Sequence, residues 1–251
     1  MYTQVKTDAE IDAMREGGKM LAIVLERLSK YVQSGMSTQD LADFAKKELH
    51  SLGGKPAFLG YQGFPDVLCV SVNEQIVHGI PRKTRLIQAG DIVSMDFGVL
   101  HKGLVTDAAI SVIVEGSSDT RVHKLLKDTE RSMYAGIDQL KHGVRVGDIG
   151  SAVQAVLDQG NYGIVKDLVG HGVGHHIHED PNIPNYGKKG SGPVLSAGMT
   201  IAIEPMATLG SGKVVMDPDN WTILSQDGSL AAHFEHTILI TQTGYEILTQ
   251  S

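Results

Sequence analysis

Two acidic residues, Asp96 and Asp107, lie within apolar stretches that are typical of a strand hairpin, residues 91–114 (DIVSMDFGVLHKGLVTDAAISVIV). If residues 101–102 form a two-residue turn, the register places Asp96 directly opposite Asp107. Facing residues of an antiparallel pair have Cβ atoms roughly 4.5–5.5 Å apart, so two charges there repel. A divalent cation between the carboxylates removes this penalty. The hairpin therefore favours a metal site, although a solvent-facing strand pair or a register shifted by a bulge at Gly103 also fits.

Two further acids and a cluster of histidines lie later in the chain. Glu204 falls in the apolar run IAIEPM and Glu235 in HFEHTILI, and each alone is typical of an edge strand. Four of the eleven histidines, those at 171, 175, 176 and 178, lie among glycines in VGHGVGHHIHEDPNIP. A single histidine beside a glycine turn is usually a surface residue. In an extended strand the histidines at 171 and 175 would share one face and the other two the opposite face, so they reach one centre only if the backbone bends.

These residues together have the composition of a dinuclear metal site. The set contains four carboxylates and one imidazole from separate strands: Asp96, Asp107, His171, Glu204 and Glu235. Such ligands suit two divalent metals roughly 3.5–4 Å apart, an arrangement used by hydrolases that include aminopeptidases. Carboxylate-rich sites with one histidine accept Mn, Fe, Co or Zn, so the composition does not identify the metal.

Composition limits the class of protein. The 251 residues carry 22 basic and 29 acidic side chains, a net charge of −7, without a block of like charges. This balance argues against nucleic acid or an anionic membrane surface as the main partner. The one cysteine, Cys69, excludes an intramolecular disulfide and suits a reducing compartment. The sequence lacks a secretory leader and a run of about 18 apolar residues, so we expect a cytoplasmic protein.

Apolar spacing and turn residues predict four helices and several strands. A capping box at Thr7 and Glu10 begins a helix that runs to about Val32, and a second helix extends from about Thr38 to Gly53. Two later helices are predicted over residues 119–141 and 146–159. Strands are predicted over residues 67–72, 201–206, 213–216, 221–224, 230–240 and 245–249, with a loop at 73–81 and a hairpin turn at Asp227-Gly228.

An internal repeat divides the chain into two similar halves. GMSTQDL, which begins at Gly35, matches GVRVGDI 108 residues later. AGDIVSMD, which ends at Asp96, matches AGMTIAIE, which ends at Glu204, at the same offset. One unit used twice predicts a pseudo-twofold architecture. We therefore expect a single catalytic domain over 1–251, with repeats of approximately 8–116 and 117–249.

A series of motifs follows along nearly the whole chain. They are GYQGFP at 60–65, VNEQIVHGIP at 72–81, GHGVGHHIHEDPNIPNYG at 170–187, IAIEPM at 201–206, and WTILSQDGSL with FEHT near the end. The series resembles the type I methionine aminopeptidases. That resemblance implies the pita-bread fold, an α/β fold in which two pseudo-twofold halves pack helices on a curved antiparallel sheet. The chain lacks the insertion of type II enzymes and the zinc-finger extension of eukaryotic type I enzymes, and so looks like the bacterial form.

The resemblance also implies roles for individual residues. The ligands of two metals would be Asp96, Asp107, His171, Glu204 and Glu235, with Asp107 and Glu235 bridging. Glu204 would also transfer a proton, while His78 and His178 would hold the peptide and stabilise the tetrahedral intermediate. The pocket for the methionine side chain would be formed by Tyr61, Phe64, Cys69, Ile177 and Trp221, which are otherwise ordinary core residues. His175 and His176 would be structural or exposed.

Three positions depart from the pattern of the family. Thr106 stands where the family often has glycine, His233 where it usually has glutamine, and Ile177 where an aromatic residue is often present. None of them is an implied metal ligand. We therefore expect these departures to affect the shape of the pocket and the peptide preference, and to leave activity intact.

The implied function is removal of the initiator methionine from nascent proteins with a small second residue, by a dimetal-activated hydroxide. The partners would be nascent polypeptide N-termini at the ribosome, with no nucleic acid and no membrane, and the protein would be a monomer. One alternative is a proline-specific aminopeptidase of the same fold, although such enzymes usually carry an extra amino-terminal domain. The others are a non-catalytic peptide-binding module, which would lack metal ligands, and a structural metal protein.

Overall fold

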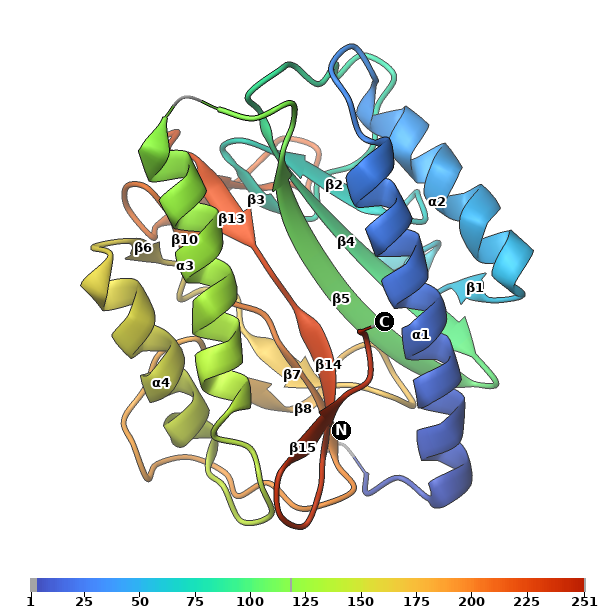
Figure 1. Ribbon diagram of the computed structural model, residues 1–251, viewed down its shortest axis with the longest axis vertical. Coiled ribbons are helices and arrows are strands. Elements are labelled where there is room, and N and C mark those ends of the chain that lie inside the picture. The colour runs from blue at the N-terminus through green and yellow to red at the C-terminus, as the bar shows by residue number, and fades with distance from the viewer. Residues whose placement is uncertain (1–3, 118, 251) are drawn as a thin grey trace.

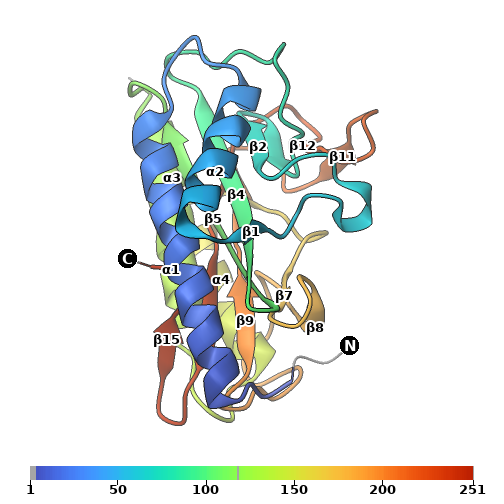
Figure 2. The same ribbon diagram turned by 90° about the vertical axis from the view of Figure 1, so that its right-hand side faces the viewer.

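The protein packs helices on antiparallel strands, in a computed structural model that describes residues 4–117 and 119–250 (Figure 1). The helices are α1 (Asp8–Tyr31), α2 (Thr38–Leu52), α3 (Thr120–Ile137) and α4 (Val146–Gln159), with a short 3-10 helix, η1 (Tyr61–Gly63). The strands are β1 (Lys55–Pro56), β2 (Cys69–Val72), β3 (Gln75–Val77), β4 (Ile92–His101), β5 (Leu104–Ile113), β6 (Gly163–Ile164), β7 (Gly170–Gly172), β8 (Glu179–Ile183), β9 (Thr200–Ile203), β10 (Met206–Thr208), β11 (Val214–Met216), β12 (Ile223–Ser225), β13 (Ala231–His233), β14 (His236–Ile240) and β15 (Tyr245–Ile247). The turned view shows α1 and α2 on one side of β4 and β5 (Figure 2). The predicted domain range of 1–251 also includes residues 1–3, 118 and 251, which lie outside this description.

Helix boundaries follow the local signals in the sequence. The Glu10 carboxylate accepts a hydrogen bond from the Thr7 N–H at 2.8 Å, and the Thr7 hydroxyl accepts one from the Glu10 N–H at 3.3 Å, which confirms the capping box. Helix α2 ends at Gly53, whose φ of 81° is the left-handed conformation that glycine adopts readily. Helix α3 ends at Ile137, before the predicted end, because tight turns with bonds from residue i to i−3 replace the last helical turn.

The central hairpin forms in a register two residues away from the predicted one. Asp96 pairs with Ala109 and not with Asp107. The turn is Lys102–Gly103, one residue later than predicted, with φ values of 49° and 85°. A two-residue hairpin turn of this kind needs positive φ at both positions, and glycine meets that need at the second. Because the shift is by two residues, both acids stay on one face and lie diagonally across the strand pair.

Two of the long predicted strands are each interrupted at an acidic residue. Residues 201–206 contain β9 and the start of β10, and residues 230–240 contain β13 and β14. The pairs β9 with β14 and β10 with β13 nevertheless share one continuous register. The gap places Glu204 opposite Glu235, next to Pro205, which has no N–H to donate to a strand ladder. The interruption is therefore local and leaves the two acids facing each other.

Two predicted connections were wrong. The predicted loop at 73–81 contains β3, which pairs with β12. The turn at 227–228 does not join a hairpin, because β12 pairs with β11 and β3 whereas β13 pairs with β10. The Asp227 carboxylate instead accepts a hydrogen bond from the Ser211 N–H at 2.7 Å, and so it holds a connection between two sheets.

The repeat detected in the sequence is present in the backbone. The Gly35 N–H donates to the carbonyl of Ile87 at 2.9 Å, and 108 residues later the Gly143 N–H donates to the carbonyl of Leu195 at 2.8 Å. Helices α2 and α4 begin three residues after these glycines in each half. The predicted pseudo-twofold α/β fold, with helices on antiparallel strands, is confirmed.

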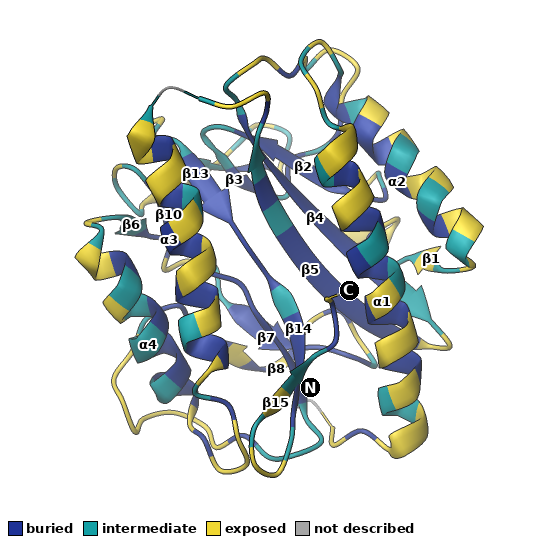
Figure 3. Ribbon diagram, in the orientation of Figure 1, coloured by how far each residue is buried: buried dark blue, intermediate teal, exposed yellow. Residues whose placement is uncertain are grey.

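Each half has its own apolar core. Buried residues of α1 and α2 pack on β2, β4 and β5, while those of α3 and α4 pack on the strands of the second half. Figure 3 shows the strands buried and the outer faces of the helices exposed. Among the described residues, no helix has the length and apolar character needed to cross a membrane. Where the two cores meet, the sheet that contains β4 and β5 lies beside the sheet that contains β9 and β14.

Candidate active site

Four carboxylates meet where the two halves join. Asp96 on β4 is opposite Ala109 on β5, and the Glu235 N–H donates to the carbonyl of Ala109 at 2.9 Å. Glu204 is opposite Glu235. A row across the strands therefore runs through Asp96, Ala109, Glu235 and Glu204, and three of these four residues are acids. Opposed residues project from the same face of a sheet, and Asp107 joins them diagonally. The junction between the halves thus gathers Asp96 from β4 and Asp107 from β5. It also gathers Glu204, which lies between β9 and β10, and Glu235, which lies between β13 and β14.

An imidazole completes the cluster from β7. His171 Nδ1 lies 2.9 Å from the carbonyl of Gly172, so its N–H donates there and the lone pair is left on Nε2. That Nε2 is 3.3 Å from Oε1 of Glu204. Gly170 permits this approach, because a Cβ at that position would lie only 2.3 Å from the carbonyl oxygen of Ala202 on β9. The local sequence therefore presents a histidine tautomer that is suited to bind a metal.

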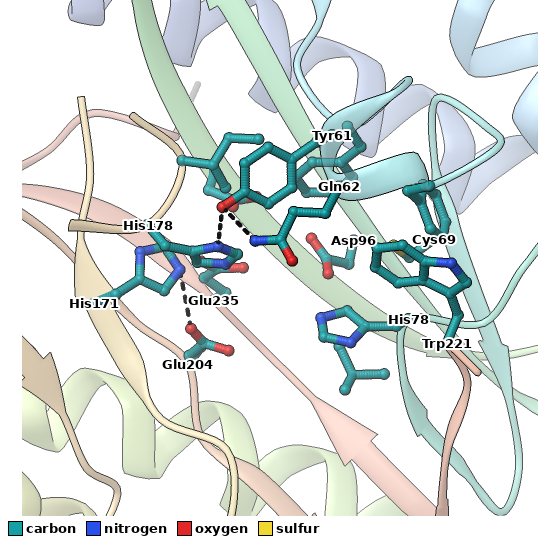
Figure 4. A pocket seen from close by; sticks show the side chains of 15 residues that line it. Tyr61, Gln62, Cys69, His78, Asp96, His171, His178, Glu204, Trp221 and Glu235 are labelled. Atoms are coloured by element: carbon teal, nitrogen blue, oxygen red, sulfur yellow. Dashed lines mark hydrogen bonds and ion pairs between the residues drawn. The ribbon is translucent and has the colours of Figure 1, made fainter. Parts of the chain in front are cut away.

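The donor atoms fit a divalent metal centre (Figure 4). Atoms of Asp107, His171 and Glu235 lie within 4.8 Å of one another, and all three side chains are buried. One carboxylate oxygen on each of Asp96, Asp107 and Glu235 is buried and has no hydrogen-bond partner among the described residues. Such orphaned oxygens are costly in a protein interior unless a cation or a donor satisfies them. The cluster accordingly indicates divalent metal binding.

Without metal, the site opposes ionisation of its own acids. Burial raises the pKa of Asp96 to about 7. Burial and then the neighbouring carboxylates raise the pKa values of Asp107, Glu204 and Glu235 well above their ordinary values. Burial, followed by the nearby His178, lowers the pKa of His171 to about 3. The imidazole is therefore neutral at pH 7, as a metal ligand must be, while the acids bind protons that a metal would displace.

Two histidines flank the acid cluster. His178 is held by Tyr61, whose hydroxyl lies 2.9 Å from Nδ1 and accepts a hydrogen bond from Gln62 Nε2 at 3.2 Å. The phenol keeps its own hydrogen, which it can donate to Nδ1 of His178, and the imidazole N–H is then on Nε2. His78 lies at the end of β3 with a φ of 58°, a conformation that costs a non-glycine residue about 1–3 kcal/mol. Such strain is typical of a functional site.

The acids open into a pocket with apolar walls. Aromatic and aliphatic side chains, together with the Cys69 thiol, line it beside the carboxylates: Phe58, Phe64, Val77, Ile177 and Trp221. Burial and the nearby acids raise the pKa of Cys69 well above its ordinary value, so the thiol is neutral and behaves as an apolar group. The pocket volume is about 140 Å³. An apolar cavity of about 150 Å³ can hold benzene, so this space suits a short unbranched side chain.

Comparison with known proteins places the chain in a family. Residues 12–242 match the model of metallopeptidase family M24. The chain belongs to this family. It is 44% identical to methionine aminopeptidase 1 of Bacillus subtilis (strain 168), an alignment that covers 98% of both chains. It is 41% identical to the methionine aminopeptidase of Aquifex aeolicus (strain VF5) over 100% of both. The resemblance carried by the sequence motifs is confirmed.

Solved structures of the family share the fold. The crystal structure of methionine aminopeptidase from Thermotoga maritima superimposes with a TM-score of 0.97 at 44% identity, covering 99% of this chain and 100% of the other. Prolidase from Pyrococcus furiosus gives a TM-score of 0.77 at 22% identity, and the match covers 98% of this chain but 65% of prolidase. The second likeness is one of fold alone. Together these neighbours confirm the predicted pita-bread arrangement of the M24 family.

The structure brings the predicted site residues together. The five predicted ligands, the two predicted outer histidines and the five predicted pocket residues all line this pocket. Sequence reasoning did not include Phe58, Gln62 and Val77 in the pocket. Gln62 and Val77 each adjoin a residue that was predicted, and this adjacency was the available signal. His233 was noted only as a departure from the family, yet its Nε2 lies 3.7 Å from Oε2 of Glu204.

The histidine-rich segment bends, which the strand alternation did not predict. The chain leaves β7 after Gly172 and returns as β8 at Glu179, so the rings of His171 and His178 lie with centroids 4.4 Å apart. His175 is half-buried and its Nε2 is 2.7 Å from Oε1 of Glu10, while His176 is exposed. The bend gathers two histidines at the site and directs the other two away from it.

A buried ion pair supports this bend from the amino-terminal segment. Lys6 Nζ lies 3.4 Å from Oε2 of Glu179, and both side chains are almost fully buried. The other carboxylate oxygen of Glu179 accepts the N–H of His176 at 2.9 Å. The Lys6 N–H donates to the carbonyl of Gly198 at 2.8 Å, which fixes the segment to the second half. The residue next to His178 is thus held by elements far away in the sequence.

Proposed function

We propose that this chain removes the N-terminal methionine from peptides and nascent proteins whose second residue is small, and that it does so with two divalent metals. One observation carries the proposal: a buried cluster of four carboxylates and a metal-ready imidazole opens into an apolar pocket. The similarity to methionine aminopeptidases over the whole chain supports the substrate.

The proposed metal ligands are the buried acids and His171. The two metals would be held by Asp96, Asp107, His171, Glu204 and Glu235. Divalent metals bound there would supply Lewis acidity and lower the pKa of water to near neutrality. The candidates are Co, Mn, Fe and Zn, all of which accept carboxylate-rich sites. The orphaned oxygens of Asp96, Asp107 and Glu235 support this ligand set.

The remaining polar residues act on the peptide. His178 would donate its Nε2–H to the oxygen of the scissile carbonyl, and His78 would hold the peptide backbone from the other side. Glu204 would take a proton on its carboxylate and deliver it to the departing amine of the second residue. The Tyr61 hydroxyl bonded to Nδ1 of His178 supports the assignment of this donor, because it selects the required tautomer.

The pocket accounts for the choice of side chain. Methionine is apolar, unbranched and polarisable, and thioether sulfur makes favourable contacts with aromatic rings. Tyr61, Phe64, Cys69, Ile177 and Trp221 would contact it, with the rings of Phe64 and Trp221 packed edge to face at 5.2 Å. Crowding at the mouth of the pocket would exclude large second residues. Of the departures from the family, Ile177 lines the pocket and would tune this fit. Thr106 instead lies beside Gly17 of α1, away from the pocket, so the expected effect of Thr106 on the pocket shape is wrong.

We also propose the setting in which the enzyme works. Nascent polypeptide N-termini in the cytoplasm, at the ribosome, would be the substrates, and the protein would act as a monomer. The whole chain would function as one catalytic domain, since ligands come from both repeats. The buried free thiol of Cys69, the one cysteine of the chain, supports a reducing compartment.

Release of methionine from short peptides tests the proposal. The protein is stripped with a chelator, reloaded with Mn²⁺ or Co²⁺, and given Met-Ala-Ser beside Met-Lys-Ser and Ala-Pro-Ser. We expect metal-dependent release from Met-Ala-Ser alone. Glu204→Gln serves as the matched variant, because it keeps the shape of the side chain, and we expect it to lose at least about a hundredfold in kcat.

Each other outcome would assign a different function or contradict one part of the proposal. Cleavage of Ala-Pro-Ser in place of Met-Ala-Ser would assign a proline-specific aminopeptidase of the same fold. Binding of two metals without any cleavage would assign a peptide-binding module. Release from Met-Lys-Ser at the same rate would contradict the restriction to small second residues while retaining the methionine pocket.

A further inference from the structure

A buried histidine lies directly behind Glu204. His233 is the last residue of β13 and is 1% exposed. Its backbone is fixed on both sides by Ser111, whose hydroxyl accepts the His233 N–H at 2.9 Å and donates to the His233 carbonyl at 2.7 Å. The residue is not among those that line the pocket. Its position is therefore rigid, and its side chain does not reach the space for a substrate.

Within the part of the chain that the structure describes, neither ring nitrogen of His233 has a hydrogen-bond partner. A neutral imidazole carries one N–H donor and one acceptor, and a buried polar group left without a partner costs about 1–3 kcal/mol. An apolar residue would avoid that cost in a position that serves packing alone. The ring must therefore serve a group that lies near it.

Glu204 is that group. His233 Nε2 lies 3.7 Å from Oε2 of Glu204, and His171 Nε2 lies 3.3 Å from Oε1. The carboxylate is thus between two imidazoles, one on each oxygen. His171 belongs to the proposed ligand set, whereas His233 lies outside that set and approaches the Glu204 carboxylate. Removing a residue that hydrogen-bonds to a metal ligand typically lowers the metal affinity by 10–100-fold.

We infer, on the basis of the proposed function, that His233 is a positioning residue for Glu204. With metal bound, its Nε2–H would donate to Oε2, which lies 3.7 Å away in this structure, and would fix the plane of the carboxylate so that Oε1 is presented to the cluster beside His171. The family resemblance would place a glutamine at this position. A glutamine side chain also carries N–H donors, so the donor is retained while its shape changes.

Metal titration of two variants tests this inference. His233→Leu removes the donor and keeps a similar apolar volume, and His233→Gln restores a donor. Mn²⁺ is titrated calorimetrically into chelator-stripped wild type and variants at one pH, and chemical unfolding of the stripped proteins is measured in parallel. We expect the leucine variant to bind Mn²⁺ 10–100-fold more weakly, the glutamine variant within about threefold of wild type, and no loss of stability in the stripped leucine variant.

A control variant removes a different, half-buried histidine near the same strands. His236 bonds to Thr249 Oγ1 at 2.9 Å through Nδ1 and contacts Tyr134, so it faces away from the acids. We expect His236→Gln to leave the Mn²⁺ affinity unchanged. His233→Met is the second apolar variant, should the leucine variant fail to fold.

The outcomes separate this inference from the proposed function. Equal Mn²⁺ affinity in wild type and the leucine variant would overturn the positioning role alone. An equal loss of affinity in the leucine and glutamine variants would do the same, because a donor would then not be the property that matters. Wild-type protein that binds no Mn²⁺ would overturn the proposed function and this inference with it.

Discussion

Replacing one proposed metal ligand should stabilise the protein when metal is absent. Asp96 is buried, shares its surroundings with three other acids, and has an oxygen without a partner. In the metal-free protein this carboxyl must either stay protonated or ionise at high cost. Asp96→Asn keeps the shape, cannot ionise, and supplies N–H donors to the neighbouring acids. The variant should therefore lose metal binding and gain stability.

The magnitude follows from the pKa of Asp96, which burial raises from 3.8 to about 7. Between these values the folded protein binds more protons than the unfolded chain, so the stability contributed by this group falls as pH rises. The cost is roughly 4 kcal/mol at pH 8 and under about 2 kcal/mol at pH 5. Histidines of lowered pKa also titrate in this range, but they are common to both proteins and largely cancel in the difference.

The assay is denaturant unfolding of stripped wild type and Asp96→Asn at pH 5 and pH 8, repeated with excess Mn²⁺. We expect the variant to be more stable at pH 8 by up to roughly 4 kcal/mol, with a smaller advantage at pH 5. Metal should reverse the order, because a ligand at a hundred times its Kd stabilises wild type by about 2.7 kcal/mol per site. A stripped variant that is less stable than stripped wild type at pH 8 would refute the reasoning.

Further predictions concern residues around the acids. Lys6→Met should destabilise the protein by about 3–5 kcal/mol in denaturant unfolding, because it removes the cation from a buried pair, and adding Glu179→Gln should recover part of this loss. Gly170→Ala should weaken Mn²⁺ binding in calorimetry without altering a ligand, since its Cβ meets the Ala202 carbonyl at 2.3 Å; unchanged affinity would contradict this. His178→Ala should lower kcat about 10²–10³-fold in peptide cleavage, with Mn²⁺ affinity retained.

Local patterns predicted the helices because helix ends depend on nearby residues. The capping box at Thr7 and the left-handed Gly53 act within a few positions of the chain, so they are visible in the sequence. The repeat was visible for a similar reason, since one offset relates both matched segments. The hairpin register was predicted wrongly because the turn was placed one residue early, although Gly103 offered the positive φ that the turn requires.

Long-range contacts explain the rest of the differences. The bend from Gly172 to Glu179 depends on Lys6, which is more than 160 positions away, and no local signal records that contact. The ligand set was assembled from unusual residue types in apolar runs and from the resemblance to a family, since its members span most of the chain. The contact between His233 and Glu204 could not be read from spacing, because it depends on how two interrupted strands pair.

The observed register of the hairpin explains how the protein accommodates several acids at one site. Had Asp96 faced Asp107 directly, the two acids would repel within one strand pair. The observed register instead separates them diagonally and places Ala109 between Asp96 and Glu235. The acids are thus held near one another by backbone pairing that belongs to both halves, and the stability of those pairs offsets their repulsion. The cluster lies where two halves with separate cores meet, and the stability of both cores offsets the cost of gathering these acids.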